Sequence, residues 1–236
     1  MAQSWRDLLF AHWQVDAAAL RPLLPSQLQI DTFEGSAWLA VVPFRMAGVR
    51  LRGTPAIPWL SAFPELNVRT YVTCEGKSGV WFFSLEAGNA LAVAIARVWF
   101  HLPYFRARMS CITREGWIHY QSERTHRGAP AGSLEGRYRP IGEVFSARRG
   151  TPEYFLTERY CLYTTDRRGR IIRGEIHHPP WLLQCAEAEL ADNSVAESLG
   201  IALASRPFLH FARRQDVLVW APQPLTAPPK DSSLPG

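Results

Sequence analysis

Polar and apolar residues alternate most regularly over residues 65–73. One face carries Leu66, Val68, Thr70 and Val72, and the other carries Glu65, Asn67, Arg69, Tyr71 and Thr73. Because successive side chains of a strand point to opposite faces, this pattern predicts a strand with one polar face. The next segment, Val80–Leu85, is continuously apolar, as in strands that are buried on both faces. The turn between the two segments predicts a hairpin.

Other β-rich runs predict further strands. They are Trp5–Val15, Leu28–Phe33, Ala37–Phe44, Tyr104–Thr113, Trp117–Arg124, Leu134–Pro140, Arg170–His177, Trp181–Ala188 and Phe208–Trp220. We expect Leu28–Phe33 and Ala37–Phe44 to form a hairpin. Residues 48–62 are rich in glycine and proline, which predicts a long loop able to overhang the mouth of a cavity.

The helices expected from the sequence are few and short. Asp16 caps a predicted helix over Ala17–Leu24, and Thr151 with Pro152 begins one at Glu153–Tyr160. Asn89–Phe100 is apolar on nearly all sides, which predicts an enclosed helix, and a fourth falls at Ser194–Leu199. The fold class expected is α+β, mostly β, with one antiparallel sheet curled towards a barrel. We expect one domain over residues 1–220 and a proline-rich disordered tail over 221–236.

Composition limits the classes of partner. The net charge of +5 comes from 24 arginines and two lysines, Lys77 and Lys230, and the arginines follow no nucleic-acid-binding motif. The longest apolar run is too short to span a bilayer. Four dispersed cysteines and the absence of a signal-peptide pattern favour a cytoplasmic protein. No metal-ligand spacing, nucleotide motif or nucleophile motif is present, so no cofactor or metal is expected. Edge strands and surface aromatic residues are compatible with a homodimer.

Three stretches carry a family resemblance. The first runs from Arg6-Asp7-Leu8 through residues 16–25 to Ile30-Asp31, the second is Phe63–Val72, and the third runs from Ser84-Leu85-Glu86 to Leu102-Pro103-Tyr104. The first and third are similar to segments of the acetoacetate decarboxylase superfamily, and the second is typical of its YqjF-like bacterial group. The resemblance implies an acetoacetate decarboxylase-like fold with an internal pocket.

The resemblance also implies site residues. Arg6, Glu65 and Arg97 match an active-site arginine, a glutamate and the arginine of a Gly-Arg-Glu motif. Tyr104 stands where the decarboxylases have their Schiff-base lysine, and no carboxylate matches their second glutamate. Tyrosine cannot form an imine with a ketone, so decarboxylation by that mechanism is not expected.

We therefore expect a pocket for a small carboxylate- or carbonyl-bearing ligand. It is lined by Arg6, Glu65, Arg97 and Tyr104, with Asn67 and Arg69 on the strand face of Glu65. If the protein is an enzyme, Glu65 acts as general acid or base, the arginines hold the anion and Tyr104 donates to an oxyanion. Lyase, isomerase or hydratase chemistry fits these roles.

Other interpretations remain open from the sequence. The polar face at Glu65 fits a solvated sheet surface as well as a pocket, and Arg6 fits a surface ion pair with Asp7. Arg97 either reaches solvent or pairs with Glu65 or Glu86, and Tyr104 fits core packing. A non-catalytic binding protein is the second hypothesis, and an interaction or nucleic-acid-binding protein using its arginine-rich surface is the third. A catalytic Glu65 should have a raised pKa, whereas a binding-only Glu65 should be held in a salt bridge.

Overall fold

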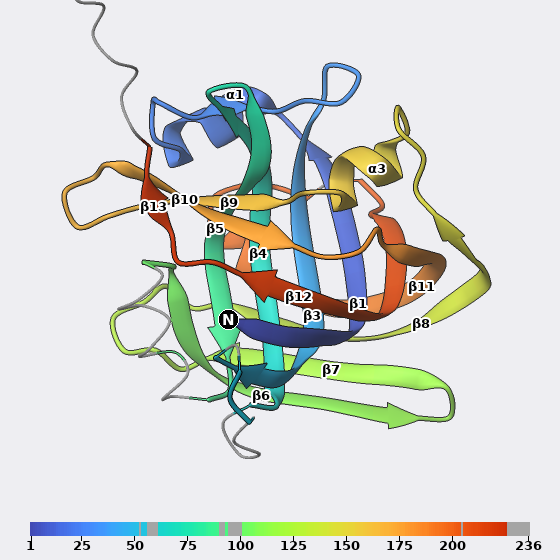
Figure 1. Ribbon diagram of the computed structural model, residues 1–236. Helices are drawn as coiled ribbons and strands as arrows, with labels where there is room; N and C mark the ends of the chain where they lie inside the picture. Colours follow the sequence, from blue (N-terminus) through green and yellow to red (C-terminus); the bar gives the residue numbers. More distant parts are fainter. Residues whose placement is uncertain (52, 56–60, 90–92, 94–100, 204, 226–236) are drawn as a thin grey trace, which may run out of the picture.

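A computed structural model describes residues 1–51, 53–55, 61–89, 93, 101–203 and 205–225. In this part of the chain, thirteen strands form one sheet in the order β13-β10-β9-β5-β6-β7-β8-β11-β12-β1-β3-β4-β2 (Figure 1). Their bounds are β1 (Ala2–Val15), β2 (Gln29–Ile30), β3 (Ala37–Arg50), β4 (Phe63–Cys74), β5 (Lys77–Ala87), β6 (Tyr104–Arg114), β7 (Trp117–Arg124), β8 (Ser133–Ser146), β9 (Cys161–Thr165), β10 (Ile171–His177), β11 (Leu182–Asn193), β12 (Phe208–Val219) and β13 (Gln223–Pro224).

The helices are short, as expected from the sequence. They are α1 (Ala17–Leu20), which continues into a 3-10 turn, α3 (Pro152–Thr157) and α4 (Ser194–Glu197). Asp16 and Thr151 cap α1 and α3 through their side-chain oxygens. Among the described helices, none has the length and apolar character needed to cross a membrane. The mostly β fold with a curled sheet is thus confirmed.

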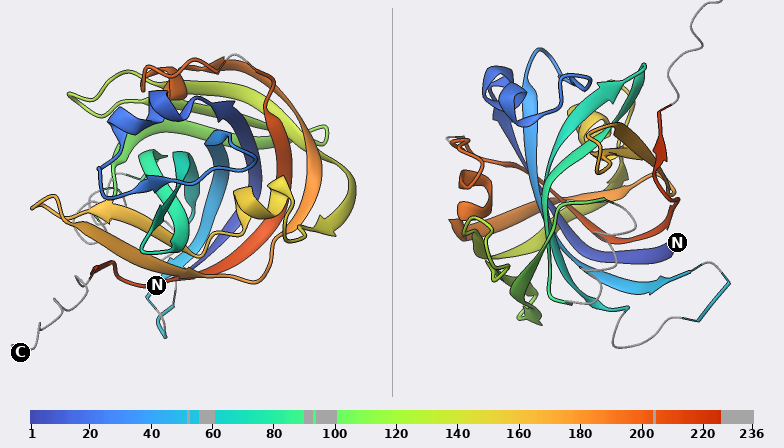
Figure 2. Two further views of the ribbon diagram at one scale, coloured as in Figure 1. Left: turned by 90° about the horizontal axis from the view of Figure 1, so that it is seen from above. Right: turned by 90° about the vertical axis from the view of Figure 1, so that its left-hand side faces the viewer.

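Additional pairings close the sheet on itself. β5 pairs with β4, β6 and β9, and β10 pairs with β12 as well as with β9. The series β4-β5-β9-β10-β12-β1-β3 therefore returns to β4, and we call it the smaller ring. A longer series through β6, β7, β8 and β11 also returns to β4. Both contain β1, β3 and β4, which run between the β6–β8 and β9–β10 sides in the view from above (Figure 2).

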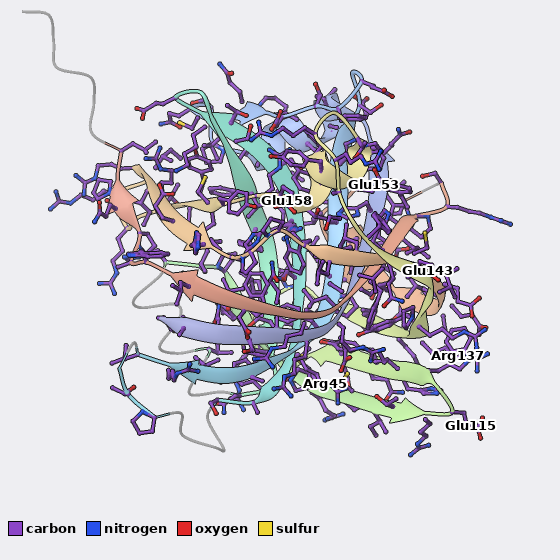
Figure 3. The ribbon with its side chains drawn as sticks, turned by 45° about the vertical axis from the view of Figure 1, so that its right-hand side comes forward. Arg45, Glu115, Arg137, Glu143, Glu153 and Glu158 are labelled. Carbon is purple, nitrogen blue, oxygen red and sulfur yellow. The ribbon has the colours of Figure 1, made fainter. Side chains whose placement is uncertain are left out.

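This shared layer is buried on both faces, which explains its long apolar runs. On β3, Ala40, Val42 and Phe44 belong to the apolar cluster inside the smaller ring, whereas Leu39 and Val41 belong to the cluster on the other face. Side chains thus fill both sides of the layer. Acidic residues such as Glu115 and Glu143, by contrast, are exposed at the outer surface (Figure 3).

The predicted hairpin of Leu28–Phe33 with Ala37–Phe44 is wrong. Only Gln29–Ile30 is extended, as β2, and it pairs with the far end of β4. Phe33 and Ser36 instead bridge to each other across the tight turn. The turn residues therefore close locally, and β3 is left to pair with β1 and β4 along its length.

Strand β9 was not predicted from the sequence. This strand has five residues, and it pairs in parallel with β5 at Val80 and Trp81, far away in the chain. Such non-local pairing leaves no turn signature. The helix expected over Asn89–Phe100 lies largely outside the described residues. Two residues of the expected tail form β13, which pairs with β10.

Candidate functional site

A cavity of about 440 Å³ lies within the smaller ring and is lined by residues from all seven of its strands. This volume falls in the range typical of small-molecule pockets. Most of the described lining residues are apolar, and the large ones include Trp5, Phe63, Phe82, Leu85, Ile176 and Trp181. Leu51, Thr54 and Pro55 line it from the segment where the sequence predicted an overhanging loop.

Glu65 and Tyr104 meet in this cavity. Glu65 of β4 lies opposite Ala87 of β5, and Tyr104 of β6 lies opposite Leu85 of the same strand. β5 therefore brings together two side chains that are distant in the sequence. The Tyr104 hydroxyl donates a hydrogen bond to Glu65 Oε2 at 3.1 Å. The backbone carbonyl of Glu65 also accepts a hydrogen bond from the Tyr120 hydroxyl of β7 at 2.7 Å.

The environment changes the acidity of both groups. Glu65 is only 2% exposed. Burial raises the pKa of its carboxyl from 4.5 to about 8, the Tyr104 hydrogen bond opposes the rise, and the charge of Glu86 adds to it. Burial, followed by the charge of Glu65, also raises the pKa of Tyr104 well above its usual value of 10.0. Near neutral pH, Glu65 thus holds an exchangeable proton and Tyr104 remains a neutral hydrogen-bond donor.

Asn67 and Arg69 line the cavity beyond Glu65 on the same strand face, and each is only 7% exposed. Asn67 Oδ1 and Arg69 Nε have no hydrogen-bond partner in the described structure. Arg69 Nη2 donates to the Leu156 carbonyl at 3.4 Å, and the guanidinium lies over the rings of Phe10 and Tyr71. Among the described residues, no carboxylate lies within ion-pair distance of Arg69. The polar face predicted from the sequence is therefore buried, and the solvated-surface interpretation is wrong.

Arg159 and His178 also line the cavity, and sequence reasoning missed both. Arg159 Nη1 donates to Asp31 Oδ2 at 2.5 Å, and its Nε donates to the Phe155 carbonyl at 2.6 Å. Asp31 thus neutralises this arginine, whereas Arg69 has no such partner. Because 128 residues separate Asp31 from Arg159, no local sequence signal indicates the pair.

The structure does not bring Arg6 to the cavity. Residues Gln3 and Trp5 line it from β1, whereas Arg6 is exposed. Asp7 has a φ of 52°, and the pairing of β1 with β3 shifts register after Arg6. This bulge reverses the alternation, so that Leu8 and Phe10 point inwards after it. The first motif therefore places its arginine on the outer face. Arg97 lies outside the described residues.

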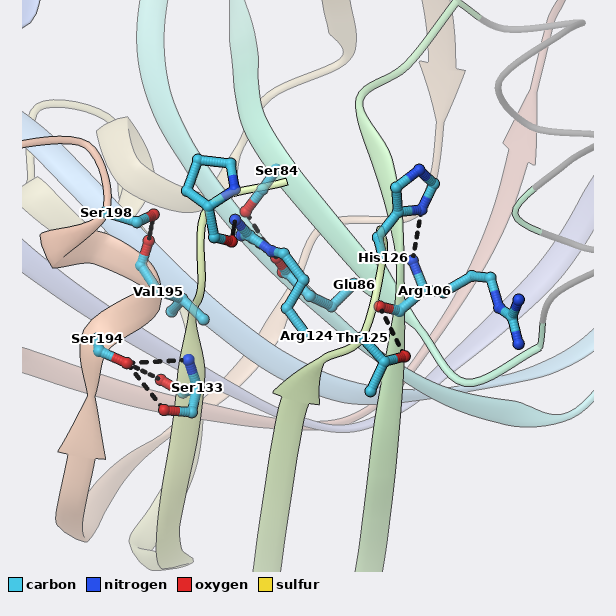
Figure 4. A network of polar contacts seen from close by, with 11 residues as sticks. Ser84, Glu86, Arg106, Arg124, Thr125, His126, Ser133, Ser194, Val195 and Ser198 are labelled. Atoms are coloured by element: carbon cyan, nitrogen blue, oxygen red, sulfur yellow. Dashed lines mark hydrogen bonds and ion pairs between the residues drawn. The ribbon is translucent and has the colours of Figure 1, made fainter. Parts of the chain in front are cut away.

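Glu86 belongs to a different polar group from the one expected. Its carboxylate is fully buried and forms a salt bridge with Arg124, whose side chain is 3% exposed. Arg124 Nε donates to Glu86 Oε1 at 2.9 Å, and the Ser84 hydroxyl donates to Oε2 at 3.3 Å (Figure 4). Neither Glu86 nor Arg124 is a lining residue of the cavity. Burial raises the pKa of Glu86 and the Arg124 salt bridge opposes that rise. The charge of Glu86 in turn contributes to the raised pKa of Glu65.

No lysine lines the cavity in the part of the chain that the structure describes. Lys77 Nζ instead pairs with Glu175 Oε2 at 2.6 Å on a half-exposed surface, and Lys230 lies outside the described residues. Within the same described ranges, no cluster of three or more His, Cys, Asp or Glu side chains is arranged to hold a metal ion. The charged, titratable and amide side chains that line the described cavity therefore include Glu65, Tyr104, Asn67, His178 and three arginines, Arg50, Arg69 and Arg159.

Comparison with known sequences identifies related proteins. The model of the family DUF2071, described as an uncharacterized conserved protein, matches residues 2–216. The chain is 50% identical over 221 residues to the uncharacterized protein YqjF of Bacillus subtilis (strain 168), and the match covers 93% of this chain and 90% of that protein. The YqjF-like resemblance inferred from the sequence is therefore confirmed.

Solved structures with a similar fold include acetoacetate decarboxylase from Legionella pneumophila. Its TM-score is 0.65 at 11% identity, with 95% of this chain and 87% of that chain covered. The enduracididine biosynthesis enzyme MppR, complexed with pyruvate, gives a TM-score of 0.64 at 12% identity, with 95% and 90% covered. Identities this low indicate a shared fold alone, and the acetoacetate decarboxylase-like fold is confirmed.

Proposed function

We propose that this chain, which belongs to the DUF2071 family of uncharacterized conserved proteins, binds a small carboxylate- or carbonyl-bearing metabolite in its cavity. The protein then catalyses a proton transfer to or from that metabolite. Glu65 is the general acid or base, and Tyr104 is the hydrogen-bond donor to the substrate oxygen. The observation that carries the proposal is the part-buried Tyr104–Glu65 hydrogen bond at 3.1 Å in a cavity of ligand size.

The state of Glu65 favours catalysis over simple binding. A carboxylate used only to hold a ligand or the fold is expected in a salt bridge, but Glu65 forms none with any described residue, and its pKa is raised to about 8. A proton donor or acceptor works best when its pKa lies near the working pH. Similar environments are common at catalytic carboxyls.

The chemistry that fits is proton transfer next to a carbonyl group. Ionised Glu65 takes a proton from the carbon beside the carbonyl, and the electron pair moves onto the carbonyl oxygen. That oxygen takes over the hydrogen bond of Tyr104, which stabilises the developing negative charge. Return of the proton to another atom completes an isomerisation. In an elimination, the electron pair on oxygen re-forms the carbonyl while a carbon–carbon double bond forms, and the leaving group departs with its bonding pair and takes the proton from Glu65.

A function based on the arginine-rich surface has less support. Several surface arginines form ion pairs with neighbouring carboxylates, including Arg108–Glu123, Arg137–Glu189, Arg139–Glu187 and Arg170–Asp166. These pairs reduce the positive charge available to phosphate groups. Binding of nucleic acid is therefore not part of the proposal.

The proposal is tested by hydrogen exchange of oxo acids in D₂O, followed by proton NMR. The panel contains pyruvate, because MppR has been solved in complex with it, together with oxo acids that carry longer alkyl or aryl bodies. Wild type is compared with Glu65→Gln and with Glu143→Gln, which removes an exposed carboxylate on β8 (Figure 3).

We expect catalysed exchange of at least one compound in wild type and in Glu143→Gln, and a loss of about 100-fold or more in Glu65→Gln. Thermal stabilisation by an acid without exchange would instead indicate a non-catalytic binding protein. Neither stabilisation nor exchange with any compound would contradict the proposal.

A further inference from the structure

The arrangement of charge in the cavity indicates which kind of ligand it takes. Three described arginines line it. Arg159 is neutralised by Asp31, and Arg50 is exposed and donates to the Gly48 carbonyl. Arg69 is buried and has no carboxylate partner among the described residues. Because Glu65 is mostly neutral at neutral pH, the buried side chains that line the described part of the cavity carry one positive charge in excess. A buried charge without a counterion is costly, so the cavity favours a single anionic group.

The position of the Arg69 guanidinium fits a carboxylate. Its Nε is a buried donor without an acceptor. Its Nη2 donates to the Leu156 carbonyl over a long distance of 3.4 Å. The planar guanidinium offers parallel donors that match the two oxygens of a carboxylate. A carboxylate bound to this guanidinium would supply the negative charge that the described residues lack.

The anion site and the proton-transfer site are at different depths of the cavity. Glu65 and Arg69 are four residues apart on one strand face, which separates their Cα atoms by about 13 Å. The Arg69 guanidinium lies over the ring of Tyr71, further along β4, and over the ring of Phe10 on β1. Glu65 in turn bonds to Tyr104 on another strand. A molecule as short as pyruvate therefore reaches one of the two sites and not both.

The wall of the cavity is mainly apolar and aromatic. Trp5 and Trp181 stack with ring centroids 6.1 Å apart, and Phe63, Phe82 and Leu85 also line the cavity. Apolar and aromatic walls bind apolar ligand surface through the hydrophobic effect. A second charged group placed against this wall would lose its hydration without gaining a partner.

We infer that the ligand is an amphiphilic monocarboxylate, which binds Arg69 through its carboxylate and the aromatic wall through an apolar body. The carbonyl on which Glu65 and Tyr104 act lies several bonds away from the carboxylate, at the opposite end of that body. This inference rests on the proposed function of the same cavity and adds the substrate class, with Arg69 as the residue that determines it.

The test is isothermal titration calorimetry with four probes. Octanoate carries the body and the charge, octanamide carries the body alone, suberate adds a second carboxylate, and pyruvate carries the charge without the body. The variants are Arg69→Gln and Arg69→Lys, with Glu65→Gln as the second-site variant and Arg127→Gln as an exposed control that removes the same charge. 7-Oxooctanoate is added in the D₂O exchange experiment.

We expect octanoate to bind wild type at least about tenfold more tightly than the other three probes, as expected for a charge-assisted hydrogen bond within an apolar site. Arg69→Gln should abolish this preference and Arg69→Lys should retain part of it, whereas Glu65→Gln and Arg127→Gln should keep it. 7-Oxooctanoate should exchange its protons next to the carbonyl faster than pyruvate, with dependence on both Arg69 and Glu65.

Equal affinity of octanoate for wild type and Arg69→Gln would overturn the inference. Tighter binding of pyruvate than of octanoate, with exchange that requires Glu65, would also overturn it but would leave the proposed function intact. Preferential binding of octanoate without exchange of any oxo acid would support the ligand class and contradict the proton-transfer function.

Discussion

The Tyr104 hydroxyl donates a hydrogen bond to Glu65 Oε2 at 3.1 Å, although 39 residues separate the two in the chain. β5 lies between their strands and pairs with both. The bond joins a carboxyl whose pKa is raised to about 8 with a phenol that remains neutral. This pair is the centre of the proposed chemistry, and Tyr104→Phe and Glu65→Gln test it directly.

Tyr104→Phe removes the hydrogen bond that stabilises ionised Glu65. The pKa of Glu65 should therefore rise further above about 8, because the Tyr104 bond lowers it in wild type. Exchange of a responsive oxo acid should fall by about 10- to 100-fold, and its pH midpoint should move to higher pH. The pH profile of the exchange rate measures both. An unchanged midpoint would show that Tyr104 does not affect the acidity of Glu65.

Glu65→Gln should change how stability depends on pH. The folded-state pKa of about 8 lies above the usual 4.5, so between these values the folded protein binds one proton that the unfolded chain lacks. This group therefore lowers stability as pH rises from about 4.5 to 8, by about 1.4 kcal/mol per pH unit. Urea unfolding at several pH values should show that Glu65→Gln gains stability over wild type along this range. Glu143→Gln serves as the control and should follow wild type.

Arg69→Met and Arg159→Met should have opposite effects on stability. Removing Arg69 eliminates a buried charge without a described carboxylate partner, so the free energy of unfolding should stay the same or increase by about 1 kcal/mol. Removing Arg159 leaves Asp31 unpaired, and because Asp31 is partly exposed the loss should be about 2 kcal/mol. Urea unfolding of both variants makes the comparison. A loss in Arg69→Met as large as that in Arg159→Met would mean that Arg69 is needed for the fold itself.

His12 should lower the stability of the folded protein at acidic pH. It is fully buried, and burial, with the nearby Arg69 charge, lowers its pKa well below 6.5. Below pH 6.5 the unfolded chain takes up a proton that the folded state does not, so stability falls as pH decreases. In His12→Gln, stability should fall less between pH 7 and pH 5 than in wild type. The exposed variant His177→Gln should fall as much as wild type. Thermal unfolding between pH 5 and 7 measures the difference, and equal slopes in the two variants would contradict it.

The part of the site that follows local patterns was predictable. The alternation over residues 65–73 placed Glu65, Asn67 and Arg69 on one face, because strand periodicity needs only neighbouring residues. The family resemblance named Tyr104 as a site residue, because it stands where the decarboxylases have their Schiff-base lysine. Its contact with Glu65, however, depends on β5 lying between their strands.

The rest of the site depends on distant contacts. Arg6 was expected in the pocket, but the bulge at Asp7 reverses the alternation of β1, and no composition signal marks that bulge. Asp31 neutralises Arg159 across the fold, and Arg124 takes the carboxylate of Glu86. Among the described residues that line the cavity, the Asp31–Arg159 pair leaves Arg69 as the buried arginine without a carboxylate partner. Only the folded chain reveals these ion pairs.

The most direct measurement is a carbon-13 NMR titration of the Glu65 carboxyl, assigned by its loss in Glu65→Gln. We expect a protonated carboxyl at neutral pH that titrates near pH 8, and a further upward shift in Tyr104→Phe. A carboxyl that titrates near 4.5 in wild type would contradict the assignment of Glu65 as the proton-transfer group.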